Sequence, residues 1–277
     1  NTFIHVNSTD STMKESKSYI DKLDSNFVII SDEQTNGKGR MGNKWISPLG
    51  NIYCSIALKF SLSIEEHFFF SILTLISIKK TLSKFGSKDI FFKWPNDVLF
   101  QNKKFGGILL ESYQNKKNKK FIIIGMGLNF ISSPIVDNYQ TTYIKNFSSI
   151  DNKYIFLENF FITFFYNWNN FLTEKKKLYN FYKKSLILLG KKIKIKTDNQ
   201  ILSGVFKDIN YDGSIILDID NEIKHIYSGN IIMEDYLKKM EDLNKFFKIP
   251  DKGLYFVSLG GIGEIGANCY LYCCDGK

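Results

Sequence analysis

The chain has 277 residues, of which 44% are apolar and 23% are charged, and its formal net charge is +9 at pH 7. A chain of this length can bury a sizeable core, and we expect one large domain plus a small one. The longest apolar run, over residues 67–78, is too short to cross a bilayer, so we expect no membrane partner. No signal peptide is visible, which predicts a cytoplasmic location, although the first residue is not Met.

The excess of basic residues suits a phosphate-bearing ligand or an acidic partner, including nucleic acid. The lysines are scattered among Asn and Ile, however, and we interpret most of them as solvated surface. The four cysteines form no CxxC pair, and the three histidines lie far apart. The sequence therefore supports neither a disulfide framework nor a resident metal site.

Short apolar stretches predict three strands in the first part of the chain, over residues 3–6, 27–30 and 52–58. A helix is predicted after the first strand, with Thr12 and Glu15 at capping-box spacing. Its inward positions recur at helical spacing: Met13, Ser16, Ile20 and Leu23. A longer helix is predicted over about residues 64–85.

Residues 34–51 (QTNGKGRMGNKWISPLGN) form a stretch that we call the glycine loop. It holds glycines at GxGxxG spacing, interleaved with cations: Gly37, Gly39, Gly42, Lys38, Arg40 and Lys44. GxGxxG is weak by itself, and the dinucleotide fingerprint also needs a helix opening from it, where this chain has turn residues. The loop is thus either an anion-binding loop of backbone N–H groups and cations or a mobile basic surface loop.

A strand predicted over residues 90–93 runs into Lys93-Trp94-Pro95-Asn96-Asp97. Proline moves the preceding residue out of the helical region, and Asn and Asp favour local turns, so this segment is a plain turn or a site at a strand end. A β-hairpin is predicted over residues 98–111. Gly106 and Gly107 weaken its second strand unless a ligand must approach closely.

The second half of the chain begins with a buried strand over residues 121–124, continued by GMGLN, which could instead be a tight bend against a helix. Residues 154–189 have a long, aromatic and helical pattern, and we interpret its aromatic stripe as core. Residues 191–233 hold short alternating stretches broken by Asp-Gly and Ser-Gly, which indicates a small antiparallel barrel.

Four of these segments together resemble the bacterial biotin protein ligases: the GKGRMGNKW loop, KWPND, KFGGILLE and GMGLN. They occur in family order, and the resemblance covers about residues 1–235. It implies an α+β fold, with a mixed-sheet, class II synthetase-like catalytic domain over residues 1–185. An SH3-like β-barrel is implied over residues 186–235.

The resemblance implies an ATP-dependent ligase that converts biotin to biotinyl-5'-AMP, with Mg²⁺, and transfers biotin to a lysine. The acceptor implied is the biotin carboxyl carrier domain of acetyl-CoA carboxylase or of another biotin-dependent carboxylase. Lipoate or octanoate transfer is the alternative. We expect no DNA binding, because the chain begins at the catalytic strand. Family members are often dimers, so a homodimer is one option, but the sequence shows no interface that would fix the oligomeric state.

The resemblance also implies site residues. The catalytic pair is Lys104 and Arg40. The biotin-binding residues are Ser11, Thr12, Met13, Gln34, Lys38, Gly39, Arg40 and Lys104. The nucleotide-binding residues are Arg40, Trp45, Lys93, Asn96, Asp97 and Asn129, with Mg²⁺ an option at Asn96 and Asp97. Met13 stands where the family has Asn, and Ser8-Thr9-Asp10 is an alternative register for the Ser-Thr pair.

Residues 236–277 have a different character. Their GLYFVSLGGIG stretch resembles the opening strands of a ribonuclease J-type metallo-β-lactamase protein, but no HxHxDH motif is present. We therefore expect no nuclease activity from this tail. A joined reading frame and a genuine C-terminal extension both remain open.

Overall fold

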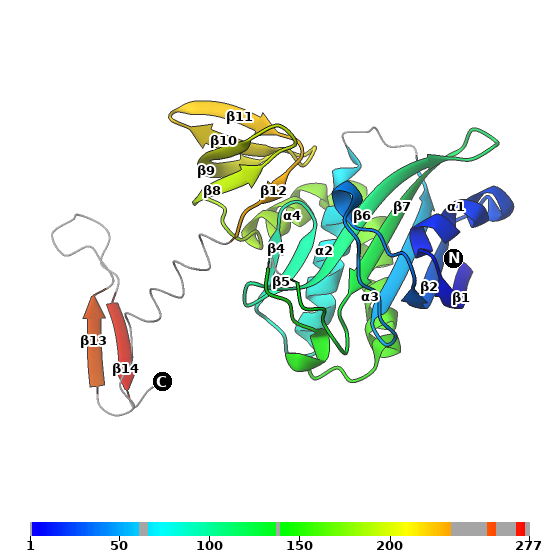
Figure 1. Ribbon diagram of the computed structural model, residues 1–277, viewed down its shortest axis with the longest axis horizontal. Coiled ribbons are helices and arrows are strands. Elements are labelled where there is room, and N and C mark those ends of the chain that lie inside the picture. The colour runs from blue at the N-terminus through cyan, green and yellow to red at the C-terminus, as the bar shows by residue number, and fades with distance from the viewer. Residues whose placement is uncertain (1, 61–65, 137–138, 234–253, 259–269, 275–277) are drawn as a thin grey trace. The chain divides into compact units, whose positions relative to one another are not determined.

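The computed structural model describes residues 2–60, 66–136, 139–233, 254–258 and 270–274 (Figure 1). Its internal contacts divide the chain into two units, Asn1–Ile232 and Met233–Lys277. The first unit contains a seven-stranded sheet and a five-stranded sheet, and the second contains a two-stranded sheet. None of the described helices is long and apolar enough to cross a membrane.

The seven-stranded sheet has the spatial order β1-β2-β3-β7-β6-β5-β4. Its strands are β1 Thr2–Thr9, β2 Phe27–Gln34, β3 Ile52–Lys59, β4 Ile90–Lys93, β5 Asp97–Phe100, β6 Lys103–Gln114 and β7 Lys120–Leu128. The β1–β2 pair is parallel, and every other neighbouring pair is antiparallel. The predicted mixed sheet is confirmed, with strands longer than expected, and the GMG segment continues β7 instead of forming a bend.

Helices cover both faces of this sheet (Figure 1). Helix α1 (Thr12–Leu23) packs on β2, β3 and β7, where Met13 and Ile20 join a core cluster with Phe27 and Phe121. Helices α2 (Phe68–Lys84), α3 (Lys153–Asn169) and α4 (Phe171–Lys184) pack together, and α2 contacts β4 and β6. Because both faces are covered, β3 is buried over seven consecutive residues instead of alternating.

The predicted capping box at the start of α1 is wrong. The N-cap is Ser11, one residue earlier, and its side chain makes no capping hydrogen bond. Glu15 instead accepts a hydrogen bond from Thr9 Oγ1 at 3.3 Å. Leu23, predicted to face the core, is 37% exposed in the last turn.

The helical pattern over residues 154–189 forms two helices, α3 and α4, because the chain breaks at Asn170. The Asn170 side chain donates to the Tyr166 carbonyl at 2.8 Å, which offers the backbone a local alternative to continuing the helix. The break turns Phe171 back onto Phe69, with ring centroids 4.5 Å apart. The aromatic stripe is core, as predicted.

The strand register brings chemically distinct residues from six strands into one row across the sheet. Directly paired in that row, from β2 to β4, are Ser31, Tyr53, Gly127, Gly107, Asp97 and Lys93. Paired residues of neighbouring strands point to the same face, so this row forms one surface. It lies on the face that α1 covers, because Ser55, two residues along β3 from Tyr53, contacts Thr12 of α1.

The five-stranded sheet is antiparallel, in the order β11-β10-β9-β8-β12. Its strands are β8 Lys192–Lys196, β9 Ile201–Ile209, β10 Ile215–Ile219, β11 Glu222–Ile226 and β12 Asn230–Ile231. The turn before β10 contains Gly213, whose φ is +89° and whose Cβ, if present, would lie 2.4 Å from Phe68 of α2. The Gly213 carbonyl accepts a hydrogen bond from the buried Trp94 indole at 2.7 Å.

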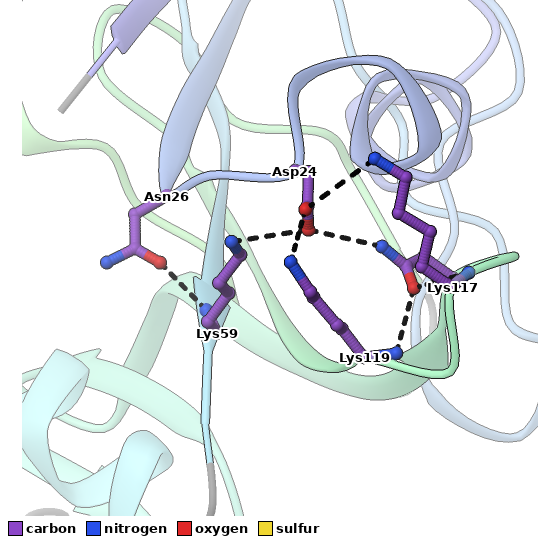
Figure 2. A network of polar contacts seen from close by, with 6 residues as sticks. Asp24, Asn26, Lys59, Lys117 and Lys119 are labelled. Atoms are coloured by element: carbon purple, nitrogen blue, oxygen red, sulfur yellow. Dashed lines mark hydrogen bonds and ion pairs between the residues drawn. The ribbon is translucent and has the colours of Figure 1, made fainter.

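Asp24 holds three segments together at the far end of α1, as Figure 2 shows. It is the left-handed C-cap of α1, with φ 45°, and its carboxylate pairs with Lys59, Lys117 and Lys119. The hydrogen bond from Lys119 is the largest cause that lowers the pKa of Asp24. These contacts join the end of α1 to β3 and to the β6–β7 turn.

The tail contributes strands β13 (Leu254–Ser258) and β14 (Tyr270–Cys274), which pair antiparallel. The remaining residues of the tail lie outside the described part of the chain. The predicted relation to a metallo-β-lactamase protein therefore stays a prediction.

Trp94→Phe is expected to lower the free energy of unfolding by about 1–3 kcal/mol, because it leaves the buried Gly213 carbonyl without its donor. Urea denaturation measures this. Trp168→Phe, at an indole that stacks on Phe171 in α4, removes similar volume and is the control. Equal losses in the two variants would contradict a specific role for the Trp94 hydrogen bond.

Candidate functional site

The glycine loop folds back on itself above the sheet. Two backbone hydrogen bonds join its two arms. The backbone N–H of Trp45 donates to the Gly37 carbonyl at 2.9 Å, and the backbone N–H of Gly39 donates to the Asn43 carbonyl at 2.7 Å. A short 3-10 turn, Arg40–Gly42, forms the tip. The fold-back returns the chain to the sheet at Trp45, so the loop is an ordered cover and not the start of a helix.

The Trp45 indole lies on the glycines of the sheet. A Cβ at Gly127 would stand 2.6 Å from Trp45 Nε1, and a Cβ at Gly107 would stand 3.5 Å from the same ring. The ligand predicted to approach Gly106 and Gly107 stays a prediction, because the nearest groups are the Leu128 side chain at Gly106 and the Trp45 indole at Gly107. Trp45 Nε1 is buried without a hydrogen-bond partner in the described structure, so a donor is available inside the site.

Asp97 is the anionic centre of the site. Its carboxylate contacts Lys104 Nζ at 2.7 Å and Lys93 Nζ at 3.5 Å, and all three side chains are at most 17% exposed. Burial by itself would raise the pKa of Asp97, but the adjacent charges of Lys104 and Lys93 lower it below its ordinary value. The carboxylate is therefore ionised and holds two cations at one sheet edge.

Lys104 is fixed at both its backbone and its side chain. Its N–H donates to the Gln140 carbonyl at 2.8 Å, and its carbonyl accepts from the Thr142 N–H at 3.0 Å. Its ammonium group lies 5.4 Å from the Trp45 ring centroid and 5.2 Å from that of Tyr139. Lys104 is thus a positioned cation under the glycine loop.

Arg40, at the tip of the loop, supplies another positive charge. Burial lowers the pKa of its guanidinium, and the nearby Asp97 carboxylate acts in the opposite direction. An arginine stays protonated under such shifts. The loop tip and the sheet edge therefore share one electrostatic environment.

Thr12 and Gln34 form the polar end of the site. The Thr12 N–H and hydroxyl both donate to Gln34 Oε1, at 2.9 and 3.2 Å. Gln34 Nε2 donates to Ser47 Oγ at 3.0 Å, and Ser55 Oγ donates to Thr12 Oγ1 at 2.8 Å. The Gln34 side chain thereby provides the cap that Ser11 does not.

Other predicted site residues have structural partners or stand apart. Asn96 donates to the Ile108 carbonyl, and Asn129 donates to the Thr142 carbonyl at 3.2 Å, so both amides brace the strands around Lys104. Met13 is 5% exposed and packs against Gly125 in the core. Lys38 is exposed on the outside of the loop. The biotin and nucleotide roles of these residues remain predictions.

Three residues that contribute to this site were missed in the sequence. Ser47 and Ser55 join the Thr12–Gln34 network, and Tyr139 flanks Lys104. Ser55 had a signal, because it is a polar residue inside an otherwise apolar strand. Tyr139 had none, since only the path of the chain brings it to Lys104.

The described residues contain no group of three or more His, Cys, Asp or Glu side chains that could hold a metal ion. At this site Asp97 offers carboxylate oxygens, but two ammonium groups already share them. This donor set does not form a closed cage for Mg²⁺, which usually keeps several waters and binds with substrate phosphates.

Comparison with known proteins places this site in a class. Residues 3–129 match the Biotin/lipoate A/B protein ligase family, and residues 188–233 match the Biotin protein ligase C terminal domain. The chain thus belongs to the class of protein ligases that handle biotin or lipoate. The two matches, in this order, show that it belongs to the biotin protein ligase family.

Individual relatives of the chain are also ligases by name. The chain is 25% identical over 218 residues to the bifunctional ligase/repressor BirA of Bacillus subtilis, covering 74% of this chain and 65% of that protein. It is 31% identical over 129 residues to the biotin–[acetyl-CoA-carboxylase] ligase of Paracoccus denitrificans, covering 46% and 53%. The chain therefore spans about two thirds of the first relative and about half of the second.

A solved structure supports the fold. The biotin protein ligase from Aquifex aeolicus in complex with biotin and ATP has a TM-score of 0.70 at 24% identity, covering 83% of this chain and 97% of that one. The predicted α+β architecture with a small C-terminal β domain is confirmed by this likeness and by the sheet topology.

Asp97→Asn is expected to lower the free energy of unfolding by about 3–5 kcal/mol at neutral pH, because two buried ammonium groups lose their counter-charge. The folded pKa is lowered, so the stabilisation is present above the unfolded value, about 3.9, and disappears as pH falls through the folded value. Urea denaturation from neutral to acid pH should show the difference from wild type shrinking. Asp151→Asn, at an exposed site, is the control, and a pH-independent difference would contradict the prediction.

Proposed function

We propose that this chain is a biotin protein ligase that activates biotin with ATP and transfers it to a lysine of a biotin carboxyl carrier domain. One observation carries the proposal: the face under the glycine loop combines a neutral donor–acceptor pair, Thr12 and Gln34, with the fixed cation Lys104, and Arg40 adds charge from the loop tip. A neutral polar end suits a urea ring, and a cationic end suits a carboxylate and a phosphate. Family membership supports this pairing.

In the first step the biotin carboxylate oxygen attacks the α-phosphorus of ATP, and the bond to the pyrophosphate oxygen breaks. Two anions must approach each other, so a cation between them lowers the barrier by positioning and charge stabilisation. Lys104 fits this role because Asp97 and its backbone bonds hold it in place before substrate arrives. Arg40 adds charge from the loop that covers the product.

In the second step the acceptor lysine amine attacks the carbonyl carbon of the biotinyl adenylate, and AMP leaves with the bonding electron pair. The chain's task is to keep the mixed anhydride away from water and other amines until the acceptor docks. The glycine loop, with Trp45 over the sheet glycines, supports such a cover. No His or Cys nucleophile is required in either step.

Several finer assignments belong to the same proposal. Mg²⁺ would enter with ATP, since its preferred partners are phosphate oxygens and waters. Lys93, Asn96, Asp97 and Asn129 would border the nucleotide. A cytoplasmic location, a homodimer and the absence of DNA binding also remain part of this hypothesis, as does the carboxylase that supplies the acceptor.

Lipoate or octanoate transfer is the rival function, because the matched family includes lipoate ligases. An acyl chain without a urea ring has no N–H or carbonyl group at that end to form hydrogen bonds with Thr12 and Gln34. Biotin-dependent pyrophosphate release from Mg·ATP, followed by mass analysis of an added carrier domain, tests the proposal. Release with lipoate or octanoate but not with biotin would overturn it.

Lys104→Ala is expected to slow biotin-dependent pyrophosphate release by about a hundredfold or more, because a fixed cation at the reacting phosphate is lost. The matched control is Lys103→Ala, since Lys103 is the exposed neighbour at the start of β6. It should release pyrophosphate at the wild-type rate. A wild-type rate from Lys104→Ala would remove Lys104 from its assigned role.

Arg40→Gly is expected to release the activated adenylate, because the covering loop loses its cation toward the phosphate. Unrelated proteins in the reaction should then become biotinylated on their lysines, as measured by mass spectrometry with a bystander protein in excess. Lys44→Gly, an exposed cation of the same loop, is the control. A product confined to the carrier domain would count against this role for Arg40.

A further inference from the structure

A continuous run of hydrogen bonds joins helix α1, strand β2 and the glycine loop. It begins at the backbone N–H of Thr12, which points to the Gln34 side-chain amide at 2.9 Å. A backbone N–H can only donate, so the atom that faces it must be the amide oxygen, Oε1. This contact determines which way the Gln34 amide is turned, an assignment that otherwise depends on the choice between two similar atoms.

The orientation of the Gln34 amide determines the position of every other hydrogen-bonding proton in the run. Gln34 Nε2 can only donate, so Ser47 Oγ accepts at 3.0 Å and sends its own proton to the Trp45 carbonyl, also at 3.0 Å. The Thr12 hydroxyl donates to Gln34 Oε1, so it must accept from Ser55 Oγ at 2.8 Å. The donor and the acceptor of every hydrogen bond in the run are therefore fixed.

With this polarity, two hydrogen-bonding groups at the polar end of the site have no partner among the described residues. Gln34 Nε2 retains its second N–H, and Thr12 Oγ1 retains one lone pair. A donor thus stands beside an acceptor. The urea ring of biotin offers the complementary pair, a carbonyl oxygen next to an N–H. The choice of biotin as the ligand here rests on the proposed function. An amide turned the other way would present the wrong polarity to that ring.

We propose that Ser47 is a positioning residue, which locks the Gln34 amide in the polarity that biotin needs. Ser47 is 8% exposed, and both of its hydrogen-bonding directions are used. Gly37 makes the contact possible, because a Cβ there would stand 2.6 Å from Ser47 Oγ and 2.9 Å from Gln34 Nε2. Ser47 therefore acts on biotin binding through the Gln34 amide.

The test is calorimetric titration of the full-length chain with biotin alone and, separately, with Mg·ATP alone. Ser47→Ala should weaken biotin binding about tenfold, because it leaves a buried amide N–H without its acceptor, while Mg·ATP affinity stays within about twofold. Ser31→Ala is the matched control: it removes a buried hydroxyl from the same strand as Gln34, bonded only to the Glu33 carbonyl in the described structure. It should leave biotin affinity unchanged.

A double-mutant cycle separates positioning from general damage. In a Gln34→Ala background, Ser47→Ala should add no further loss of biotin affinity, because Ser47 acts through Gln34. If Ser47→Ala does not fold, Ser47→Cys, of similar size but with weak hydrogen bonding, replaces it with the same expectations.

Three results would overturn the inference. Biotin affinity within twofold of wild type in Ser47→Ala would do so, as would equal losses for biotin and Mg·ATP, or a full additional loss in the Gln34→Ala background. Biotin binding by the wild-type chain shows whether the Ser47 inference alone fails or the proposed function fails with it. A wild-type chain that binds biotin while Ser47→Ala binds it equally well defeats the inference alone, whereas a wild-type chain without biotin affinity defeats the proposed function as well.

Discussion

The hydrogen bond from the Thr12 backbone to the Gln34 side chain is the contact on which the site depends. A helix begins with N–H groups that have no partner inside the helix, and the N-cap Ser11 supplies none through its side chain. Gln34, at the end of β2, supplies the oxygen instead. Docking of α1 on the sheet and assembly of the polar end of the site are therefore one event, and neither is complete without the other.

The cationic end obeys a different constraint. Cations that await an anionic substrate in a partly buried site must be stabilised beforehand, and Asp97 provides that charge to Lys104 and Lys93. The strand register places Asp97 next to Gly107 and Gly107 next to Gly127. The charge centre and the glycine surface under Trp45 are thus adjacent, and the site has its electrostatic field before substrate binds.

The strands of the large sheet could be predicted from the sequence, but the strand register and several long-range contacts of the site could not. The apolar stretches gave the strands of the large sheet, and Lys104 before Phe-Gly-Gly was correctly placed at a hairpin strand. The register was not predictable, because no local pattern states that Asp97 pairs with Gly107. Ser47 lies in the glycine loop but was not a predicted site residue, because its hydrogen bond reaches an amide thirteen residues earlier. The break at Asn170 lies within an aromatic stripe that continues through it, so no local pattern marked it. The predicted capping box does not form, because the side chain of Gln34, a tertiary contact, accepts from the Thr12 N–H.

The bond between Trp94 and Gly213 also bears on how the protein is made. The KWPND turn that carries Asp97 is braced by a carbonyl that lies 119 residues later in the chain. During synthesis the large sheet can form from the first part of the chain, as N-terminal segments generally fold first. The turn gains its brace only after the β10 segment leaves the ribosome. A nascent chain halted before residue 213 would hold every predicted site residue and still lack the hydrogen bond that braces the turn before Asp97.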